Sequence, residues 1–204
     1  LYSWLIINGT YSEGIYTSTR IAYNSVSAAC YKPFVEQFRP QPCEVEQGEW
    51  EQEEARFDFL ESEHFKFMNY GRSSLIRGER IHHILWQPKI RKPFITLFGR
   101  SIHRTLAVAH LAILSDSEII IIDDDKAQSD LRSGQYGGIR HYVPLRHVSS
   151  IEVNPSSRDI LVMSVHLGNE GKRVDKLFEA ANQAKVEVFR SALDGLRHAI
   201  RMDG

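Results

Sequence analysis

The side chains most suited to binding chemistry lie between Trp86 and Arg104, where basic residues flank a short apolar run. The range 86–104 contains no Asp or Glu, and its basic residues are Lys89, Arg91, Lys92, Arg100 and Arg104. Ammonium and guanidinium groups bind anionic oxygens, and an Arg guanidinium can grip a phosphate through two parallel hydrogen bonds. We therefore interpret these five residues as candidate ligands for an anionic lipid or another phosphate-bearing group.

The apolar run between the basic residues allows three interpretations. Its members are Phe94, Ile95, Leu97 and Phe98. They could pack on the N-terminal region as core, form a patch that binds a protein partner, or enter a membrane surface. A basic residue near an anionic leaflet contributes about 1 kcal/mol, and full burial of a large apolar side chain contributes about 1.5–3 kcal/mol. Whether Phe94 to Phe98 face solvent decides among the three.

Other chemistry finds less support in the sequence. His82 and His83 are adjacent, so a strand would place them on opposite faces and not on one metal ion. The acids 123–125 lack the glycine and the distant Glu of a calcium loop. The chain contains no glycine-rich phosphate loop, no nucleophile elbow and no His-Glu-x-x-His, and its basic segment matches no RNA-reading motif. We expect no metal, no cofactor and no catalysis, and the sequence argues against nucleic acid as the partner.

Composition is that of a globular protein. The 204 residues are 42% hydrophobic and 25% charged, with a net charge of −1, which gives no general attraction to nucleic acid or to an anionic membrane. We interpret Cys30 and Cys43 as free thiols of a reducing compartment, with one disulfide between them as the alternative. The chain has no apolar run of the roughly 18 residues that a spanning helix needs, so we expect a cytoplasmic protein, with peripheral binding to the inner face of the membrane as the alternative.

Charge is nevertheless arranged along the chain. The stretch 44–63 holds nine acids against Arg56 alone. Runs of like charge are typical of solvated faces and linkers, and this run follows the proline-broken sequence "RPQPC". We interpret it as an acidic linker inside an N-terminal extension, residues 1–77, of unknown fold. As an alternative, the acidic stretch folds over the basic segment and competes with its ligand.

The elements past this stretch follow from periodicity. A helix is predicted over 65–76 and ends at Gly78. Strands are predicted over 81–86, with Ile81, His83 and Leu85 on one side, over 105–116, over the isoleucine run 118–122 and over 139–153, with a hairpin across 158–180. The apolar residues from Val186 to Ile200 step by three and four, which predicts an amphipathic C-terminal helix.

Three of these segments resemble the bacterial pleckstrin-homology-like (PH-like) or GRAM-like domain. They are "GERI" (78–81), "HLAILSDSEIIII" (110–122) and "YVPLRHVSSIEV" (142–153), and the resemblance covers about residues 78–200. Ser115 and Glu118 stand where the superfamily commonly has Thr and Arg. The resemblance implies an α+β fold: a curved antiparallel β-barrel capped by a C-terminal amphipathic helix, over residues 78–204. It also implies headgroup ligands in the loop between the first two strands, where Lys89 to Arg104 lie.

The sequence thus predicts a non-enzymatic binding module that mediates protein–protein interaction. Peripheral binding to anionic lipid through Lys89 to Arg104 is the alternative, and self-association stays open.

Overall fold

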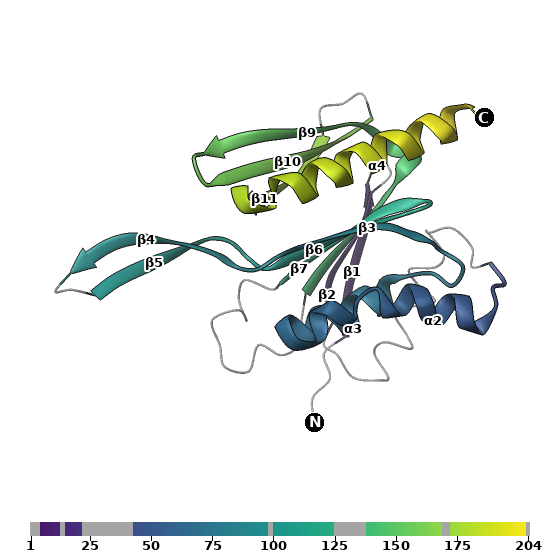
Figure 1. Cartoon of the computed structure of the whole chain (residues 1–204), viewed down its shortest axis with the longest axis horizontal. Helices are drawn as coiled ribbons and strands as arrows, with labels where there is room; N and C mark the ends of the chain where they lie inside the picture. Colours follow the sequence, from purple (N-terminus) through teal and green to yellow (C-terminus); the bar gives the residue numbers. More distant parts are fainter. Residues whose placement is uncertain are drawn as a thin grey trace.

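The computed structural model describes residues 5–12, 15–21, 43–97, 100–124, 138–168 and 172–202. Its strands form three antiparallel sheets, and its helices cover both faces of the largest one (Figure 1). The elements up to β5 are β1 (Leu5–Ser12), β2 (Ile15–Ile21), α2 (Gln47–Ala55), the 3-10 turn Asp58–Leu60, α3 (Glu61–Ser74), β3 (Ile81–Gln87), β4 (Ile90–Leu97) and β5 (Arg100–Ala107). The later elements are β6 (His110–Ser115), β7 (Glu118–Asp124), β8 (Gly138–Pro144), β9 (Val148–Ser157), β10 (Ile160–Leu167), β11 (Lys172–Glu179) and α4 (Gln183–Met202).

A six-stranded sheet forms the middle layer. Its strand order is β1-β2-β8-β7-β6-β3, so the N-terminal hairpin β1–β2 extends the sheet beside β8. Helix α3 covers one face, and α4 with the three-stranded sheet β11-β10-β9 covers the other (Figure 1). Strands β4 and β5 form a separate two-stranded sheet that projects from this body.

Two cores lie on the two faces of the middle layer, and β7 contributes to both. Ile120 and Ile122 enter the core beneath α3, while Ile119 and Ile121 enter the core beneath α4. All four side chains are 0% exposed. A strand that is buried on both faces has no polar alternation, which explains the unbroken run of isoleucines.

Helix α4 closes the second core as its apolar spacing predicts. Val186, Phe189 and Leu193 are each 0% exposed, and Leu196 packs against them while partly buried. Ile200 was expected on the same stripe, but it is 40% exposed because the helix extends past the core there. The predicted α+β class with antiparallel sheets and a C-terminal helix is confirmed.

The expected closed barrel is not present among the described strands. The four strands β3, β6, β7 and β8 belong to one sheet and β9, β10 and β11 to another, and no described strand pairing joins the two sheets. The sheets instead pack face to face through the core beneath α4. The apolar residues that were expected to fill a barrel interior therefore pack between two stacked sheets.

The acidic stretch 44–63 is not a linker. It forms α2, a 3-10 turn and the beginning of α3. Phe57 and Leu60 are 0% exposed, and Trp50 packs against the same core. Three large apolar residues with near-helical spacing thus fix the stretch to the body, while most of its acids are exposed.

Two smaller expectations about β3 and α3 are also corrected. Ile81 and Leu85 enter different cores, because a bulge between Ile81 and His83 shifts the strand by one residue. Phe65, expected on the apolar side of α3, is 59% exposed. The predicted helix over 65–76 is observed as Glu61–Ser74, so it ends before Gly78, which lies in the following turn with φ 95°, a conformation that favours glycine.

Candidate functional site

The basic segment is a β-hairpin and not a loop. Strands β4 and β5 pair antiparallel from Ile90↔Ala107 to Leu97↔Arg100, and Figure 1 shows them reaching well away from the body. We call the pair Ile90–Leu97 and Arg100–Ala107 the arm. The PH-like resemblance implied a loop here. Pro93 lies within β4, and a two-stranded sheet consists only of edge strands, where a proline is tolerated. The predicted strand over 105–116 is correspondingly broken at residues 108 and 109.

The predicted basic ligands have different positions on the arm. Arg91 and Arg104 are exposed, on opposite strands. Lys92 lies opposite Arg104 but reaches back to the β9–β10 turn, where its Nζ donates to Ser157 Oγ at 3.3 Å and lies 3.7 Å from Asp159 Oδ2. Lys92 therefore ties the arm to the body. Lys89 is half-buried at the root of the arm, and the side chain of Arg100 lies outside the described residues.

Beyond Ile90, which is buried at the root, the large apolar residues of the arm are exposed where the structure describes them. Phe94 is 63% exposed, so its interpretation as core is wrong. The side chains of Ile95, Leu97 and Phe98 lie outside the described residues. On the second strand Ile102 is 54% and Leu106 39% exposed, and both were missed because the sequence analysis ended the apolar run at Phe98. Strand alternation on β5 would have found them.

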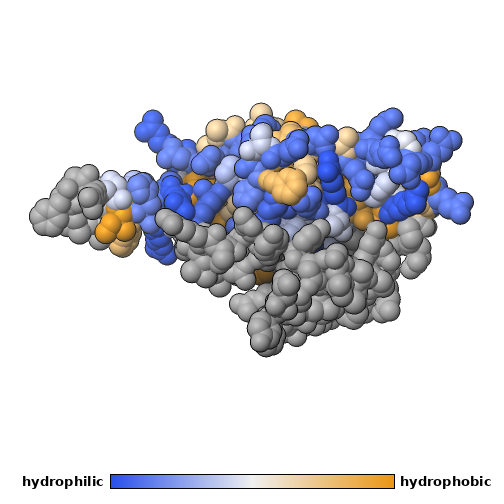
Figure 2. All heavy atoms as spheres, turned by 90° about the horizontal axis from the view of Figure 1, so that it is seen from below, coloured by the Kyte–Doolittle hydropathy of each residue, from blue (hydrophilic) through white to orange (hydrophobic). Residues whose placement is uncertain are grey.

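One face of the arm combines charge and apolar surface. Ile102 and Arg104 lie two residues apart in the regularly paired part of β5, so both point to the same side, while Leu106 is the extra residue of a bulge nearer the root. Figure 2 shows hydrophobic and hydrophilic surface side by side along the arm. An exposed apolar residue alone is ordinary, but several exposed apolar residues on one hairpin together with an exposed guanidinium are typical of binding surfaces.

A buried polar group fixes the root of the arm. The side chain of Gln87 is 0% exposed, and its Oε1 accepts hydrogen bonds from the backbone N of Glu179 at 2.9 Å and from Asn182 Nδ2 at 3.0 Å. Its Nε2 donates to the carbonyl oxygen of Pro88 at 3.0 Å. The end of β3 is thus joined to the end of β11 and to the turn before α4.

His110 lies on the other strand of the same root. The ring is 1% exposed, packs edge-on against Phe178 at 4.9 Å, and shares a hydrogen bond of 3.1 Å between Nδ1 and the carbonyl oxygen of Val108. Within the described part of the chain its Nε2 has no hydrogen-bond partner. Burial, only partly opposed by the Val108 hydrogen bond and the charge of Asp123, lowers the pKa of His110 to about 4. The ring is neutral at pH 7.

Asp123 pairs with His110 in the sheet register and is the centre of a charged group. It forms ion pairs with Lys176 and, at 3.4 Å, with His141. Burial would raise the pKa of Asp123, but the hydrogen bond from His141 and the positive charge of Lys176 outweigh it and lower the pKa to about 2. These charges are paired with one another, so they hold the end of β7 and do not form an open ligand site.

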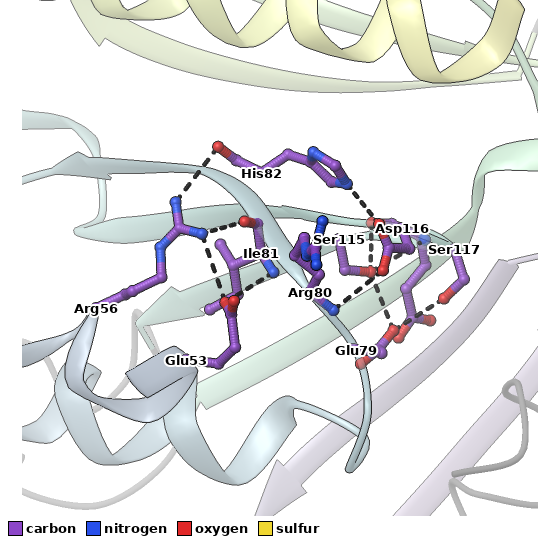
Figure 3. Close-up of polar contacts among 10 residues, drawn as sticks. Glu53, Arg56, Glu79, Arg80, Ile81, His82, Ser115, Asp116 and Ser117 are labelled. Atoms are coloured by element: carbon purple, nitrogen blue, oxygen red, sulfur yellow. Dashed lines mark hydrogen bonds and ion pairs between the residues drawn. The ribbon is translucent and has the colours of Figure 1, made fainter. Parts of the chain in front are cut away.

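Two of the three segments that carry the PH-like resemblance, 78–81 and 110–122, meet in a second polar group (Figure 3). Glu79 is 7% exposed, and its Oε1 accepts from Ser115 Oγ at 3.0 Å and Ser117 Oγ at 2.9 Å. Its Oε2 accepts from the backbone N of Ile76 at 2.7 Å. Ser115 Oγ also accepts from the backbone N of Glu118 at 3.2 Å, which shapes the β6–β7 turn. These contacts stabilise the turn, and they occupy both carboxylate oxygens of Glu79 with hydrogen bonds inside the protein.

An open cleft of about 210 Å³ lies beside this group. Its lining residues are Val45, Glu49, Trp50, Gln52, Glu53, Gly78, Glu79 and Arg80. Two of its carboxylates, those of Glu53 and Glu79, are engaged by the backbone N–H groups of Ile81 and Ile76. The cleft therefore lies between α2 and the segment before β3, and its two engaged carboxylates do not point together at a common ligand position.

Among the residues with described positions, no three His, Cys, Asp or Glu side chains come together in a geometry that could hold a metal ion. No helix within the described ranges has the length and apolarity needed to cross a bilayer.

The expected competition between the acidic stretch and the basic segment is contradicted by their positions. Helix α2 and the arm lie toward opposite ends of the long axis of the molecule (Figure 1). The acids of 44–63 therefore do not cover the basic residues of the same chain.

Comparison with family models, with curated proteins and with solved structures found no significant match to this chain.

Proposed function

We propose that this chain is a non-enzymatic binding module of the PH-like type and that it binds a protein partner through the arm. The observation that carries the proposal is the arm itself. It projects from the body, exposes Arg91, Phe94, Ile102 and Arg104, and comes from a segment without a single acid.

The order of the elements supports the PH-like part of the proposal. β3, β6, β7 and β8 are neighbours in chain order within one sheet, and β9, β10 and β11 follow as a second meander before the helix α4. The arm is inserted between β3 and β6, the first and second strands of that series. This is where the PH-like resemblance places its ligand-binding loop.

The chemistry of the arm indicates the kind of partner. Exposed guanidinium groups favour an acidic surface and speed the encounter, and their effect on the association rate falls with salt. Phe94 and Ile102 would contribute about 1.5–3 kcal/mol each on full burial. We therefore propose a partner surface on which an apolar depression is surrounded by carboxylates.

Photo-crosslinking tests this proposal. A photoreactive residue at Ile102 should give protein adducts in cells, and one at the exposed Val188 of α4 serves as the background control. The double variant Arg91→Glu/Arg104→Glu should abolish the Ile102 adducts and leave those at Val188 unchanged. Adducts at Ile102 that do not exceed the control, or that survive charge reversal, would refute the proposal.

A second candidate function is binding to an anionic membrane. The register favours it because Phe94, Ile95 and Leu97 lie on the outer half of β4, with Arg91 and Lys92 nearer the root and Arg100 opposite Leu97. Each of those basic residues would contribute about 1 kcal/mol near an anionic leaflet. Sedimentation with phosphatidylserine vesicles, compared with phosphatidylcholine vesicles, tests it. If the wild-type chain and Arg91→Glu/Arg104→Glu sediment equally, the membrane function is excluded.

A further inference from the structure

The acidic counterpart of the arm lies on the same chain but at its other end. Four exposed acids lie on α2 and directly before it, and we call them the acidic surface: Glu44, Glu46, Glu49 and Glu51. The arm carries exposed Arg91 and Arg104. Figure 1 places α2 and the arm toward opposite ends of the long axis. Contacts between these two surfaces therefore need two molecules.

The acidic surface is held on a rigid element. On the inner side of α2, Glu53 Oε2 accepts from the backbone N of Ile81 at 3.0 Å, and the Arg56 guanidinium donates to the carbonyl oxygens of Ile81 and His82 (Figure 3). Trp50 packs against the core beneath α3. The inner side of the helix is thus fixed to β3, so the outward-facing acids do not need to be ordered when a partner binds.

The charges of the whole chain allow two copies to approach. The net charge is only −1, so two molecules repel each other weakly while their basic and acidic regions attract. Within the described residues neither Arg91 nor Arg104 forms an ion pair. Both Arg side chains therefore remain available for carboxylates of another molecule.

We infer that the partner of the arm is a second copy of this chain, with the arm of one molecule lying on the acidic surface of the other. This inference rests on the proposed function and names its partner. When two elongated molecules lie antiparallel, each arm reaches the acidic surface of the other, and the two contacts form together. The second contact is then intramolecular within the pair and strengthens the association.

Sedimentation velocity of the full chain provides the first test. At about 0.01 M salt the Debye length is about 30 Å and at about 1 M it is about 3 Å, so the attraction should operate only at the lower value. We expect a mass of two copies or more at low salt, and a dissociation constant at least about tenfold higher at high salt. A monomer at low salt across the accessible concentration range would overturn the inference.

Charge exchange provides the specific test. Arg91→Glu/Arg104→Glu and Glu46→Lys/Glu49→Lys should each be monomeric at low salt, and an equimolar mixture of the two should associate again. Arg146→Glu/Lys185→Glu makes the same change in net charge away from the arm and should associate like the wild type. A mixture that stays monomeric, or a control that dissociates, would contradict the inference.

The two proposals fail differently in these experiments. Glu46→Lys/Glu49→Lys leaves the arm intact. If the proposed function is right but the partner is a different protein, adducts between Ile102 and that protein should persist in this variant. If the adducts from Ile102 are copies of the chain itself and disappear in Glu46→Lys/Glu49→Lys, the inference holds. If the photoreactive residue at Ile102 forms no protein adduct in the otherwise unchanged chain, the proposed function is refuted.

Discussion

Replacing His110 with leucine should reduce the loss of unfolding free energy as the pH falls from 7 to 4. The ring is 1% exposed at the root of the arm, and burial lowers its pKa from the ordinary 6.5 to about 4. As the pH falls below about 6.5, the unfolded chain binds a proton at this position and the folded chain does not. The stability that depends on His110 is complete above about pH 6.5 and is lost progressively down to about pH 4.

The size of the effect follows from the two pKa values. A difference of about 2.5 units at about 1.4 kcal/mol per unit gives about 3 kcal/mol of stability lost between pH 7 and pH 4. Leucine at this position cannot titrate, so the variant should keep those 3 kcal/mol. At pH 7 it should be less stable by about 1 kcal/mol, because the carbonyl oxygen of Val108 loses its hydrogen bond to the ring.

Urea unfolding at pH 7 and pH 4, followed by tryptophan fluorescence, measures both quantities. The matched control is His103→Gln, which removes an exposed histidine of the arm and should follow the wild-type profile. His64, His83 and His147 also have lowered pKa values, so the wild type loses further stability over the same range. The difference between the wild type and His110→Leu isolates the one residue. Equal losses in both proteins would refute the reasoning.

Two predictions test the packing of the body by chemical denaturation. Phe189→Ala should lower the free energy of unfolding by about 3–5 kcal/mol because its side chain is 0% exposed, whereas Val188→Ala, at 55% exposure on the same helix, should change it by less than about 0.5 kcal/mol. Gly71→Ala should destabilise by about 1–3 kcal/mol because a Cβ there would overlap the ring of Phe57, while Gly195→Ala, with open space around it in α4, should stabilise by about 0.5–1 kcal/mol. Equal effects within either pair would contradict the described packing.

Sequence periodicity predicted the elements whose burial is regular. The apolar stripe of α4 and the isoleucine run of β7 each follow from one simple pattern, and the structure places both where that pattern requires. The bulge between Ile81 and His83 has no such signal. It moves Ile81 to the other core through a change in backbone pairing, which side-chain types do not reveal.

Charge patterning and the PH-like resemblance led the prediction away from the structure in two places. Nine acids in 44–63 indicated a linker, but Trp50, Phe57 and Leu60 decide the outcome because burial of three large apolar side chains outweighs the preference of exposed acids for solvent. In the arm, the resemblance implied a loop. Alternation across Ile102, Arg104 and Leu106 was the signal for a strand, and it was present in the sequence.

In the arm, changes that alter binding can be separated from changes that alter folding stability. Among its residues with described side chains, only Ile90 at the root is buried. Most substitutions between Arg91 and Leu106 therefore change the exposed surface without removing core packing. Variants of the chain can diverge in what they recognise while keeping the same folding equilibrium, and a hairpin from a related sequence could be transplanted onto this body at residues 90 and 107.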